Sequence, residues 1–213
     1  MRSQNLILLR SMCNSSSSSS TNNTTSAKKS MLYTRTGDKG TSSLYNLERR
    51  PKDDPVFAAL GDTDELNSAI GIAREYCDEN ILQERLAVVQ SRLLDIGSAV
   101  ATPPAKSKDN KLERVKFDES HIELLEGWID EMDAAVPPLR NFILPSGGLC
   151  ATHLHLARSV CRRAERRCVA LTSTDAVQSS VTRYMNRLSD FLFAAARYAA
   201  VREGREEVAY KKE

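Results

Sequence analysis

Residues 141–168 read N-F-I-L-P-S-G-G-L-C-A-T-H-L-H-L-A-R-S-V-C-R-R-A-E-R-R-C and decide the fold of this chain. The stretch begins apolar, turns at Ser146 and the two glycines after it, and continues as a helix. At about 100° per residue, four small side chains of this helix fall within a narrow arc: Ala157, Cys161, Ala164 and Cys168. That arc predicts the face that packs in the core, with the two cysteines as buried thiols.

The rest of the same helix carries five arginines: Arg158, Arg162, Arg163, Arg166 and Arg167. Like charges one turn apart destabilise a helix, so we expect an anion to compensate them. A guanidinium group can donate two parallel hydrogen bonds to the oxygens of a phosphate, which makes a polyphosphate the first candidate ligand. The alternative is a solvated basic face whose arginine stems cover apolar surface. The helix alone does not decide between the two.

The composition is typical of a globular protein. The 213 residues, 41% hydrophobic and 27% charged, are enough for one substantial domain with a tail. A net charge of +2 excludes a global field that steers the protein to nucleic acid or to an anionic membrane. No apolar run is long enough to span a bilayer. The five cysteines lack C-x-x-C spacing, which argues against a zinc site or a disulfide framework and for a reducing compartment.

Residues 1–30 differ in composition from the rest of the chain. They contain arginine and many serines, and the first acidic residue of the sequence is Asp38. This composition fits a disordered mitochondrial transit peptide, and the alternative is a disordered tail on a cytoplasmic protein. We expect the first, with a mitochondrial matrix location and a single domain over residues 31–213.

Residues 31–55 are predicted to form a loop that binds anions. Gly37 and Gly40 allow positive φ and close approach of the backbone to a ligand. Hydroxyl and amino groups that could join their amides in an anion-binding nest come from Thr34, Thr36, Ser42, Ser43, Lys39 and Lys52. The Walker pattern is absent, so this is not a P-loop, and alone the G-D-K-G turn is a weak signal.

Five segments have helical periodicity: roughly 56–75, 82–100, 120–132, the arginine helix after Gly148, and 181–203. The second carries a heptad-like seam, and the third follows a predicted capping box of Ser120 and Glu123. Prolines end the second and third, and residues 103–116 are predicted as an exposed loop. With few strand signals, the prediction is an all-α fold, a five-helix bundle with an N-terminal phosphate-binding loop.

The last helix carries a second pattern, a polar face opposite its apolar stripe: Arg183, Asn186, Asp190 and Arg197. A solvated face is the common explanation, but such a set could also meet a ligand or a neighbouring subunit, and we expect an oligomer. His153 and His155 point about 200° apart on a helix, and no H-E-x-x-H pattern is present. A dedicated catalytic metal site is therefore not expected.

Six motifs resemble those of the trimeric ATP:cob(I)alamin adenosyltransferases, the family that includes the mitochondrial corrinoid adenosyltransferase. They are Y-T-R-T-G-D-K-G-T-S-S, E-R-R-P-K-D-D, T-D-E-L-N, F-I-L-P-S-G-G, V-C-R-R-A-E-R-R and N-R-L-S-D, in order over residues 31 to 210. The resemblance implies a five-helix bundle, a homotrimer with active sites between subunits, and transfer of the 5′-deoxyadenosyl group of ATP to cob(I)alamin with release of triphosphate. It also implies Mg²⁺ bound with ATP, and methylmalonyl-CoA mutase as a candidate recipient of the product.

The resemblance also implies site residues. Its ATP-binding positions fall on Thr34, Arg35, Thr36, Gly37, Ser42, Ser43, Lys52, Arg162, Arg163, Ala164, Glu165, Arg166 and Asn186. Arg162 and Arg166 would stabilise the leaving triphosphate, so they are also expected to be catalytic. Asp64 and Arg158 match a catalytic pair that bridges subunits on the cobalamin side. Phe142 matches the aromatic against the lower face of the corrin, although without the resemblance a core aromatic is the commoner explanation.

One position departs from the family pattern. Many relatives have glycine where this chain has Leu47, before E-R-R-P-K. We therefore expect Asn46 to supply any left-handed geometry that the turn requires. Two other functions remain to be weighed against the enzyme: a nucleotide-sensing or nucleic-acid-binding bundle, and a purely structural bundle. The small net charge and the few aromatics beside the arginines argue against the former, and the loop and the two polar faces argue against the latter.

Overall fold

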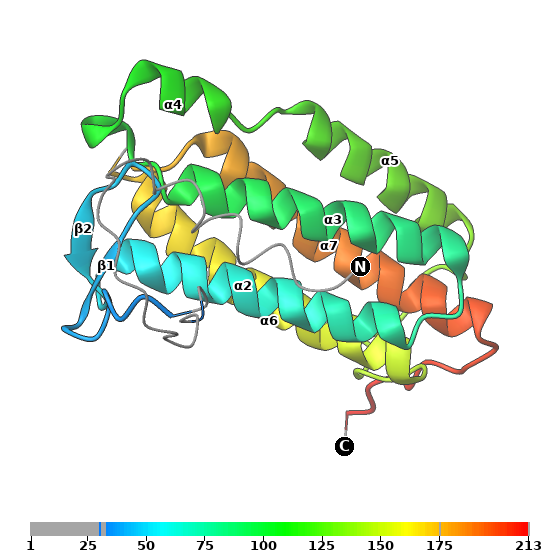
Figure 1. Cartoon of the computed structure of the whole chain (residues 1–213). Helices are drawn as coiled ribbons and strands as arrows, with labels where there is room; N and C mark the ends of the chain where they lie inside the picture. The colour runs from blue at the N-terminus through cyan, green and yellow to red at the C-terminus, as the bar shows by residue number, and fades with distance from the viewer. Residues whose placement is uncertain (1–29, 31–32, 175, 213) are drawn as a thin grey trace, which may run out of the picture.

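The computed structural model describes residue 30, residues 33–174 and residues 176–212, and it is mostly helical (Figure 1). Within these residues the α-helices are α2 (Pro55–Glu75), α3 (Asn80–Val100), α4 (Asp109–Arg114), α5 (Ser120–Ala134), α6 (Leu149–Thr172) and α7 (Ser179–Arg202). A 3-10 turn, η1, spans Pro104–Lys106, and two short strands are β1 (Thr41–Ser43) and β2 (Arg49–Pro51). The predicted targeting segment lies almost wholly outside the described residues.

The strands correct the prediction of an irregular loop over residues 31–55. β1 and β2 pair antiparallel, with Ser42 opposite Arg50. The turn between them is closed by a hydrogen bond of 2.8 Å from the Leu44 amide to the Glu48 carbonyl. The segment was not recognised as a hairpin because each strand has only three residues and most of its side chains are polar.

The turn of this hairpin also corrects the expectation for Asn46. Leu47, not Asn46, has the positive φ, at 74°. The Asn46 side-chain oxygen instead accepts a hydrogen bond of 3.0 Å from the Glu48 amide. That bond stabilises the turn around Leu47, and an ordinary L-residue therefore occupies a left-handed conformation that glycine adopts without strain.

The helices pack through the stripes that their periodicity predicted. α6 contacts both α2 and α7, while α3 packs on α2 and α5 packs on α7. The heptad-like seam of α3 is confirmed, because every member is at most 1% exposed: Leu82, Leu86, Val89, Leu93, Ile96 and Val100. Burying each large aliphatic side chain contributes roughly 1.5–3 kcal/mol, so this seam fixes α3 on its neighbours.

Two details of the loops differ from the predictions. Residues 103–116 are not wholly irregular, since they contain η1 and α4. α5 begins at Ser120, but the predicted capping box does not form. Instead, a side-chain oxygen of Asp118 accepts a hydrogen bond of 2.8 Å from the Ser120 amide. Asp118 thus satisfies a backbone donor at the start of the helix in place of Glu123.

The two ends of the bundle carry different features (Figure 1). The β1–β2 hairpin lies at the end where α2 begins and α3 ends, and the Tyr45 amide donates to the Ala101 carbonyl there at 3.0 Å. The segment that leads into α6 and the tail that follows α7 meet at the opposite end, where Ile143 forms a β-bridge with Ala209. α6 runs between these two ends and connects them.

Candidate functional site

The core arc of α6 lies as predicted. Ala157, Cys161, Ala164 and Cys168 are all 0% exposed. Burial raises the pKa of the Cys161 thiol far above its ordinary value and that of Cys168 to about 12, so both thiols are neutral and unreactive. The arginines of α6 are thereby turned towards its flanks and its outer face.

Two of these arginines are neutralised by α2. Arg163 hydrogen-bonds Glu65, and its Nε lies 3.5 Å from a carboxylate oxygen of Asp62. Arg167 has its Nε 3.6 Å from the other oxygen of Asp62. These ion pairs join α6 to α2 and neutralise both guanidinium groups.

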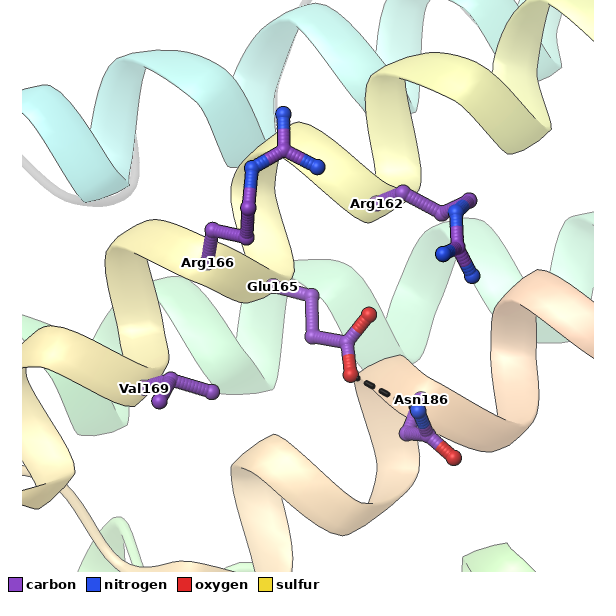
Figure 2. A pocket seen from close by; sticks show the side chains of 5 residues that line it. All are labelled: Arg162, Glu165, Arg166, Val169 and Asn186. Carbon is purple, nitrogen blue, oxygen red and sulfur yellow. Dashed lines mark hydrogen bonds between the residues drawn. The ribbon is translucent and has the colours of Figure 1, made fainter.

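Two other arginines of α6 line a pocket and have no such partner. Arg162, Glu165, Arg166, Val169 and Asn186 surround an open pocket of about 280 Å³ between α6 and α7 (Figure 2). Among the described residues, neither Arg162 nor Arg166 has a hydrogen-bond or ion-pair partner. Asn186 donates a hydrogen bond of 2.8 Å to Glu165, which links α7 to α6 across the pocket. The pocket therefore presents two uncompensated positive charges beside a fixed polar pair.

A second pocket of about 300 Å³ continues from the first, because the two share Glu165, Val169 and Asn186. Residues of α5 and α7 complete its wall: Ile122, Glu126, Thr182, Arg183 and Arg187. Both added arginines are already paired, Arg183 with Glu119 at 2.8 Å and Arg187 with Glu126 at 2.9 Å. The unneutralised charge of this continuous groove is thus confined to its α6 side.

The predicted anion-binding loop is built around the hairpin. Residues 34–40 lead into β1, and Lys52 follows β2. The Lys52 amide donates to the Gly40 carbonyl at 2.9 Å. The Lys52 side chain lies over Gly37, since a Cβ added to Gly37 would be 3.3 Å from the Lys52 Nζ. The structure therefore brings together Lys52 and the glycine loop, which lie more than ten positions apart in sequence.

The remaining predicted members of this loop lie near its surface. Thr34 and Thr36 share a hydrogen bond of 2.9 Å between their hydroxyl groups. Arg35 has a positive φ of 56°, and its guanidinium lies 5.5 Å from the centre of the Tyr33 ring. Ser42 and Ser43 belong to β1, where Ser43 is exposed. The loop thus exposes hydroxyl groups at the end of the bundle where α2 begins.

Asp64 and Arg158 lie on different helices and do not pair within the described chain. Asp64 is exposed on α2. Arg158, on α6, has a buried Nε without a hydrogen-bond partner among the described residues, and its guanidinium lies 5.8 Å from the centre of the Phe193 ring. Arg158 therefore lacks one hydrogen-bond acceptor among the described residues of this single chain. A buried donor without an acceptor is costly, so a partner from outside the chain would stabilise it.

His155 lies beside Arg158 on α6, and its role there was not predicted from the sequence. It is 5% exposed and packs against Phe193, with ring centres 5.9 Å apart. Burial lowers its pKa, and the nearby charge of Arg158 lowers it further, so the imidazole is neutral at neutral pH. The spacing of three residues between His155 and Arg158 places both on one side of α6 and was a signal that could have joined them.

Phe142 lies in an exposed strip that leads into α6. Its side chain is 82% exposed, which excludes the alternative of a core aromatic, and Leu144 is 46% exposed. The tail after α7 pairs with this strip: the Leu144 amide donates to the Val208 carbonyl at 2.8 Å, and the Tyr210 amide donates to the Phe142 carbonyl at 2.7 Å. The backbone of this strip is therefore paired with the tail, and the strip is not a free loop.

The polar face predicted for α7 holds only in part. Arg183, Asn186 and Asp190 are exposed, but Arg197 is 4% exposed. Arg197 donates to Glu207 at 3.2 Å and to the Pro137 carbonyl at 2.7 Å. The prediction of a polar face is therefore wrong for Arg197, because the tail after α7 folds back and covers it.

In the described part of the chain, no group of three or more histidine, cysteine, aspartate or glutamate side chains is arranged to hold a metal ion. No helix there is long and apolar enough to cross a membrane.

The sequence matches a family model described as cobalamin adenosyltransferase over residues 32–199. Similar proteins include the corrinoid adenosyltransferase MMAB of Mus musculus, 50% identical over 85% of this chain and 77% of the relative. The Homo sapiens protein of the same name is 50% identical over 85% of this chain and 73% of its own length. A corrinoid adenosyltransferase of Bacillus subtilis is 42% identical over 85% of this chain and 92% of its own length.

Solved structures of similar fold come from Lactobacillus reuteri. One is a variant of a PduO-type ATP:corrinoid adenosyltransferase complexed with cobalamin and ATP, with a TM-score of 0.79 and 36% identity over 85% of this chain and 99% of the other. Another variant of that protein, complexed with ATP, has a TM-score of 0.76 and 37% identity over 84% of this chain and 100% of the other. The similarity therefore spans the helices and the groove.

Proposed function

The chain belongs to the cobalamin adenosyltransferase family, and we propose that its groove on α6 binds the triphosphate of ATP. It is an ATP:corrinoid adenosyltransferase, which transfers the 5′-deoxyadenosyl group of ATP to cob(I)alamin, forming adenosylcobalamin and releasing triphosphate. One observation carries the proposed ATP site: Arg162 and Arg166 line the same pocket, and neither is neutralised within the described chain.

The residues around the triphosphate divide by charge and by position. Arg162 and Arg166 bind phosphate oxygens, and Glu165 and Asn186 hold the adjacent wall through their hydrogen bond. Arg163, which stays paired with α2, is assigned to the edge of the site by the family motif. Ala164 contributes by packing, because it is fully buried between them. These assignments follow the family motif V-C-R-R-A-E-R-R.

The hairpin supplies the second part of the ATP site in this proposal. Lys52 contributes a positive charge, and the remaining contacts come from backbone amides and hydroxyl groups: Thr34, Arg35, Thr36, Gly37, Ser42 and Ser43. The contact of Lys52 with the glycine loop supports this, since charge and amides then point at one anion. The five long helices with this hairpin as a phosphate-binding loop form one domain over residues 31–213.

The reaction requires positioning and electrostatics more than proton transfer. Cob(I)alamin is a strong nucleophile, so no protein base is needed for its attack on the 5′ carbon of ATP. Negative charge grows on the triphosphate as the carbon–oxygen bond breaks, and Arg162 and Arg166 stabilise it. Fixed groups on packed helices also hold the two substrates in line, which removes an entropic part of the barrier.

Mg²⁺ is proposed to bind with ATP and not at a preformed protein site. Glu165 is the one carboxylate among the described residues that line the first pocket, and it already accepts a hydrogen bond from Asn186. A cation that keeps few protein ligands and binds mainly phosphate oxygens fits this donor set. When bound, Mg²⁺ would neutralise part of the triphosphate charge.

We assign the cobalamin side to the seam between subunits of a homotrimer. Asp64 of one subunit is proposed to accept from Arg158 of its neighbour, which would satisfy the buried Nε that lacks a partner in one chain. Exposed apolar side chains on α2, at its C-cap and on α6 support burial in an assembly: Ile72, Tyr76, Leu149 and Leu156. Phe142, exposed at the end of the bundle, is proposed to lie against the lower face of the corrin, where it keeps an axial ligand away from cobalt.

Localisation and delivery are further parts of the proposal. The acid-free, serine-rich composition of residues 1–30 supports import into the mitochondrial matrix, with a cytoplasmic location as the alternative. Expression of residues 1–30 fused to a fluorescent protein tests this, and a diffuse cytoplasmic signal would favour the alternative. Methylmalonyl-CoA mutase is the proposed recipient of the product in the matrix.

The ATP site is tested with three variants of α6. Purified protein receives ATP, Mg²⁺ and chemically reduced cobalamin, and the visible spectrum reports adenosylcobalamin. Removing one charge-assisted hydrogen bond costs about 1.5–3 kcal/mol, so we expect Arg162→Ala and Arg166→Ala each to lower kcat/KM for ATP roughly 10- to 100-fold. Arg167→Ala is the matched control, because the same side chain on the same helix is paired with Asp62 outside the pocket.

Two outcomes would contradict these assignments. Equal losses in all three variants would mean that α6 requires its total charge and not a phosphate site at Arg162 and Arg166. Wild-type kcat/KM in Arg162→Ala and Arg166→Ala would remove the ATP site from this groove. For the seam, Asp64→Asn and Arg158→Ala are combined: the double variant should be no worse than either single variant if the two side chains act as a pair.

A further inference from the structure

The tail that follows α7 is attached to the strip that carries Phe142. Besides the two backbone hydrogen bonds and the Ile143–Ala209 bridge, the Val208 amide donates to the Ser146 hydroxyl at 2.9 Å. Residues 205–210 thus contact the strip at both of its ends. The backbone of an exposed aromatic is held here by pairing with a tail and not by the helices.

An ion pair between Arg197, which is buried, and Glu207, which is partly buried, joins this tail to α7. The guanidinium of Arg197, on α7, donates through Nε to Glu207 at 3.2 and 3.4 Å, and both side chains are largely shielded from water. The second nitrogen, Nη2, donates to the Pro137 carbonyl at 2.7 Å, and Asp133 lies 3.9 Å from the third nitrogen. Arg197 therefore contacts the chain both before the strip, at Pro137, and after α7, at Glu207.

We infer that the Arg197–Glu207 ion pair is a positioning device for the corrin-binding strip, and that Arg197 and Glu207 are positioning residues for the reaction. Neither residue contacts a substrate in this scheme. Arg197 fixes the tail, the tail pairs with residues 142–146, and that pairing sets the height and direction of Phe142. The inference rests on the proposed contact between Phe142 and the corrin.

The charge of Arg197 makes this device specific. A buried guanidinium is stable only when its donors are satisfied, so the tail has one preferred position, with Glu207 next to Arg197. Backbone pairing alone would allow a slip of the tail along the strip, because the exposed side chains there impose little register. The ion pair of Glu207 with the buried Arg197, next to a short β-bridge, removes that freedom.

Glu207→Ala tests the inference: it leaves Arg197 bound to Pro137 but removes its carboxylate partner. Because an unpaired buried guanidinium destabilises the fold, the Tm of the variant is measured first, and Glu207→Gln, which keeps an acceptor for Arg197, provides the test if Glu207→Ala is destabilised. Glu206→Ala is the matched control, since Glu206 is exposed and adjacent. Hydrogen–deuterium exchange of the full-length protein should show faster exchange at the Leu144 and Tyr210 amides in Glu207→Ala and wild-type exchange in Glu206→Ala.

Steady-state kinetics then separate positioning from general damage. We expect the KM for cob(I)alamin to rise roughly tenfold in Glu207→Ala, below the about 100-fold cost of a misplaced reacting group, with the KM for ATP unchanged. Glu207→Gln, which keeps an acceptor for Arg197, should give an intermediate KM for cob(I)alamin. A structural defect without a positioning role would instead change both KM values or kcat alone.

Three results would overturn the inference. One is wild-type exchange at Leu144 and Tyr210 in Glu207→Ala, which would mean that the ion pair does not hold the tail. Another is faster exchange without any change in cob(I)alamin kinetics while Phe142→Ala still impairs them, which rejects the device but leaves the proposed function intact. If Phe142→Ala itself changes neither the KM for cob(I)alamin nor the four-coordinate Co(II) signal in electron paramagnetic resonance, the corrin assignment fails, and this inference fails with it.

Discussion

The turn of the β1–β2 hairpin should be more stable with glycine at position 47 than with alanine. Leu47 has a φ of 74° and is 58% exposed, so much of its side chain is in solvent while its backbone is strained. Comparing Leu47→Gly with Leu47→Ala isolates the backbone, because both variants remove the leucine side chain beyond Cβ. Any difference between them reports the conformation and not lost packing.

The expected difference follows from two opposing effects. A non-glycine residue in the left-handed region costs about 1–2 kcal/mol, which favours Leu47→Gly. Glycine gains more conformational freedom in the unfolded chain, which disfavours it by about 0.5–1 kcal/mol. The net free energy of unfolding should therefore be higher in Leu47→Gly than in Leu47→Ala by about 0.5–1 kcal/mol. For a chain of this length that difference raises Tm by about 1–4 °C.

Gly40 provides an internal control for the same comparison. Its φ is also 74°, and an added Cβ would meet no atom within 4 Å, so Gly40→Ala changes the backbone preference and nothing else. Thermal unfolding is followed by circular dichroism at one fixed protein concentration, since assembly makes Tm depend on concentration. We expect glycine to exceed alanine at both positions by a similar amount.

Two outcomes at position 47 would contradict the backbone strain assigned to Leu47. If Leu47→Ala is as stable as Leu47→Gly while Gly40→Ala is destabilised as expected, Leu47 does not adopt the left-handed conformation in solution. If neither position shows a difference, the hairpin opens before the helices unfold, and its strain does not contribute to Tm. Local exchange of the Leu44 amide then measures the hairpin directly.

Three other perturbations have definite expected outcomes. Gly147→Ala should lower the free energy of unfolding by at least about 2 kcal/mol in a urea titration, because its φ is 92° and its Cβ would lie 2.6 Å from that of Ala200; wild-type stability would exclude this close contact. The pKa of Glu48 is lowered from 4.5 to about 2 by hydrogen bonds from Arg50 and then from Lys106, so its stabilisation is complete above pH 4.5 and is lost as the pH falls towards 2. Glu48→Gln should therefore lose less stability than the wild type between pH 5 and pH 2 in acid titrations, and parallel curves would contradict the pairing. ATP with Mg²⁺ at about 100 times its Kd should stabilise the protein by about 2.7 kcal/mol, and adding EDTA should reduce this shift; no shift in Tm at saturating ATP would contradict the site.

Local pattern predicted the parts of this molecule that depend on one helix at a time. The core arc through Cys161 and the α3 seam through Leu93 were both correct, because a helical repeat maps spacing directly onto burial. The contact between Asn186 and Glu165 was not predicted from periodicity, and only the family motifs place both residues in one site.

Contacts between segments that are far apart in the sequence could not be predicted from local patterns. Arg163 finds Glu65 across 98 positions of sequence, and no spacing rule links them. Arg197 was assigned to an exposed face because periodicity cannot show that a later tail covers it. The hairpin was missed since its strands are too short for alternation, and Leu44 is the buried residue that fixes it on the helices.

The pairing of the tail with residues 142–146 also affects how the protein is made. Residues 205–210 leave the ribosome after all the helices, so α2, α3, α5 and α6 can begin to pack while the strip before α6 still lacks its partner. The surface that carries Phe142 is therefore completed only after all the helices have been synthesised. A nascent chain that stalls after α7 would then hold its arginine groove in place but would present Phe142 on an untethered loop.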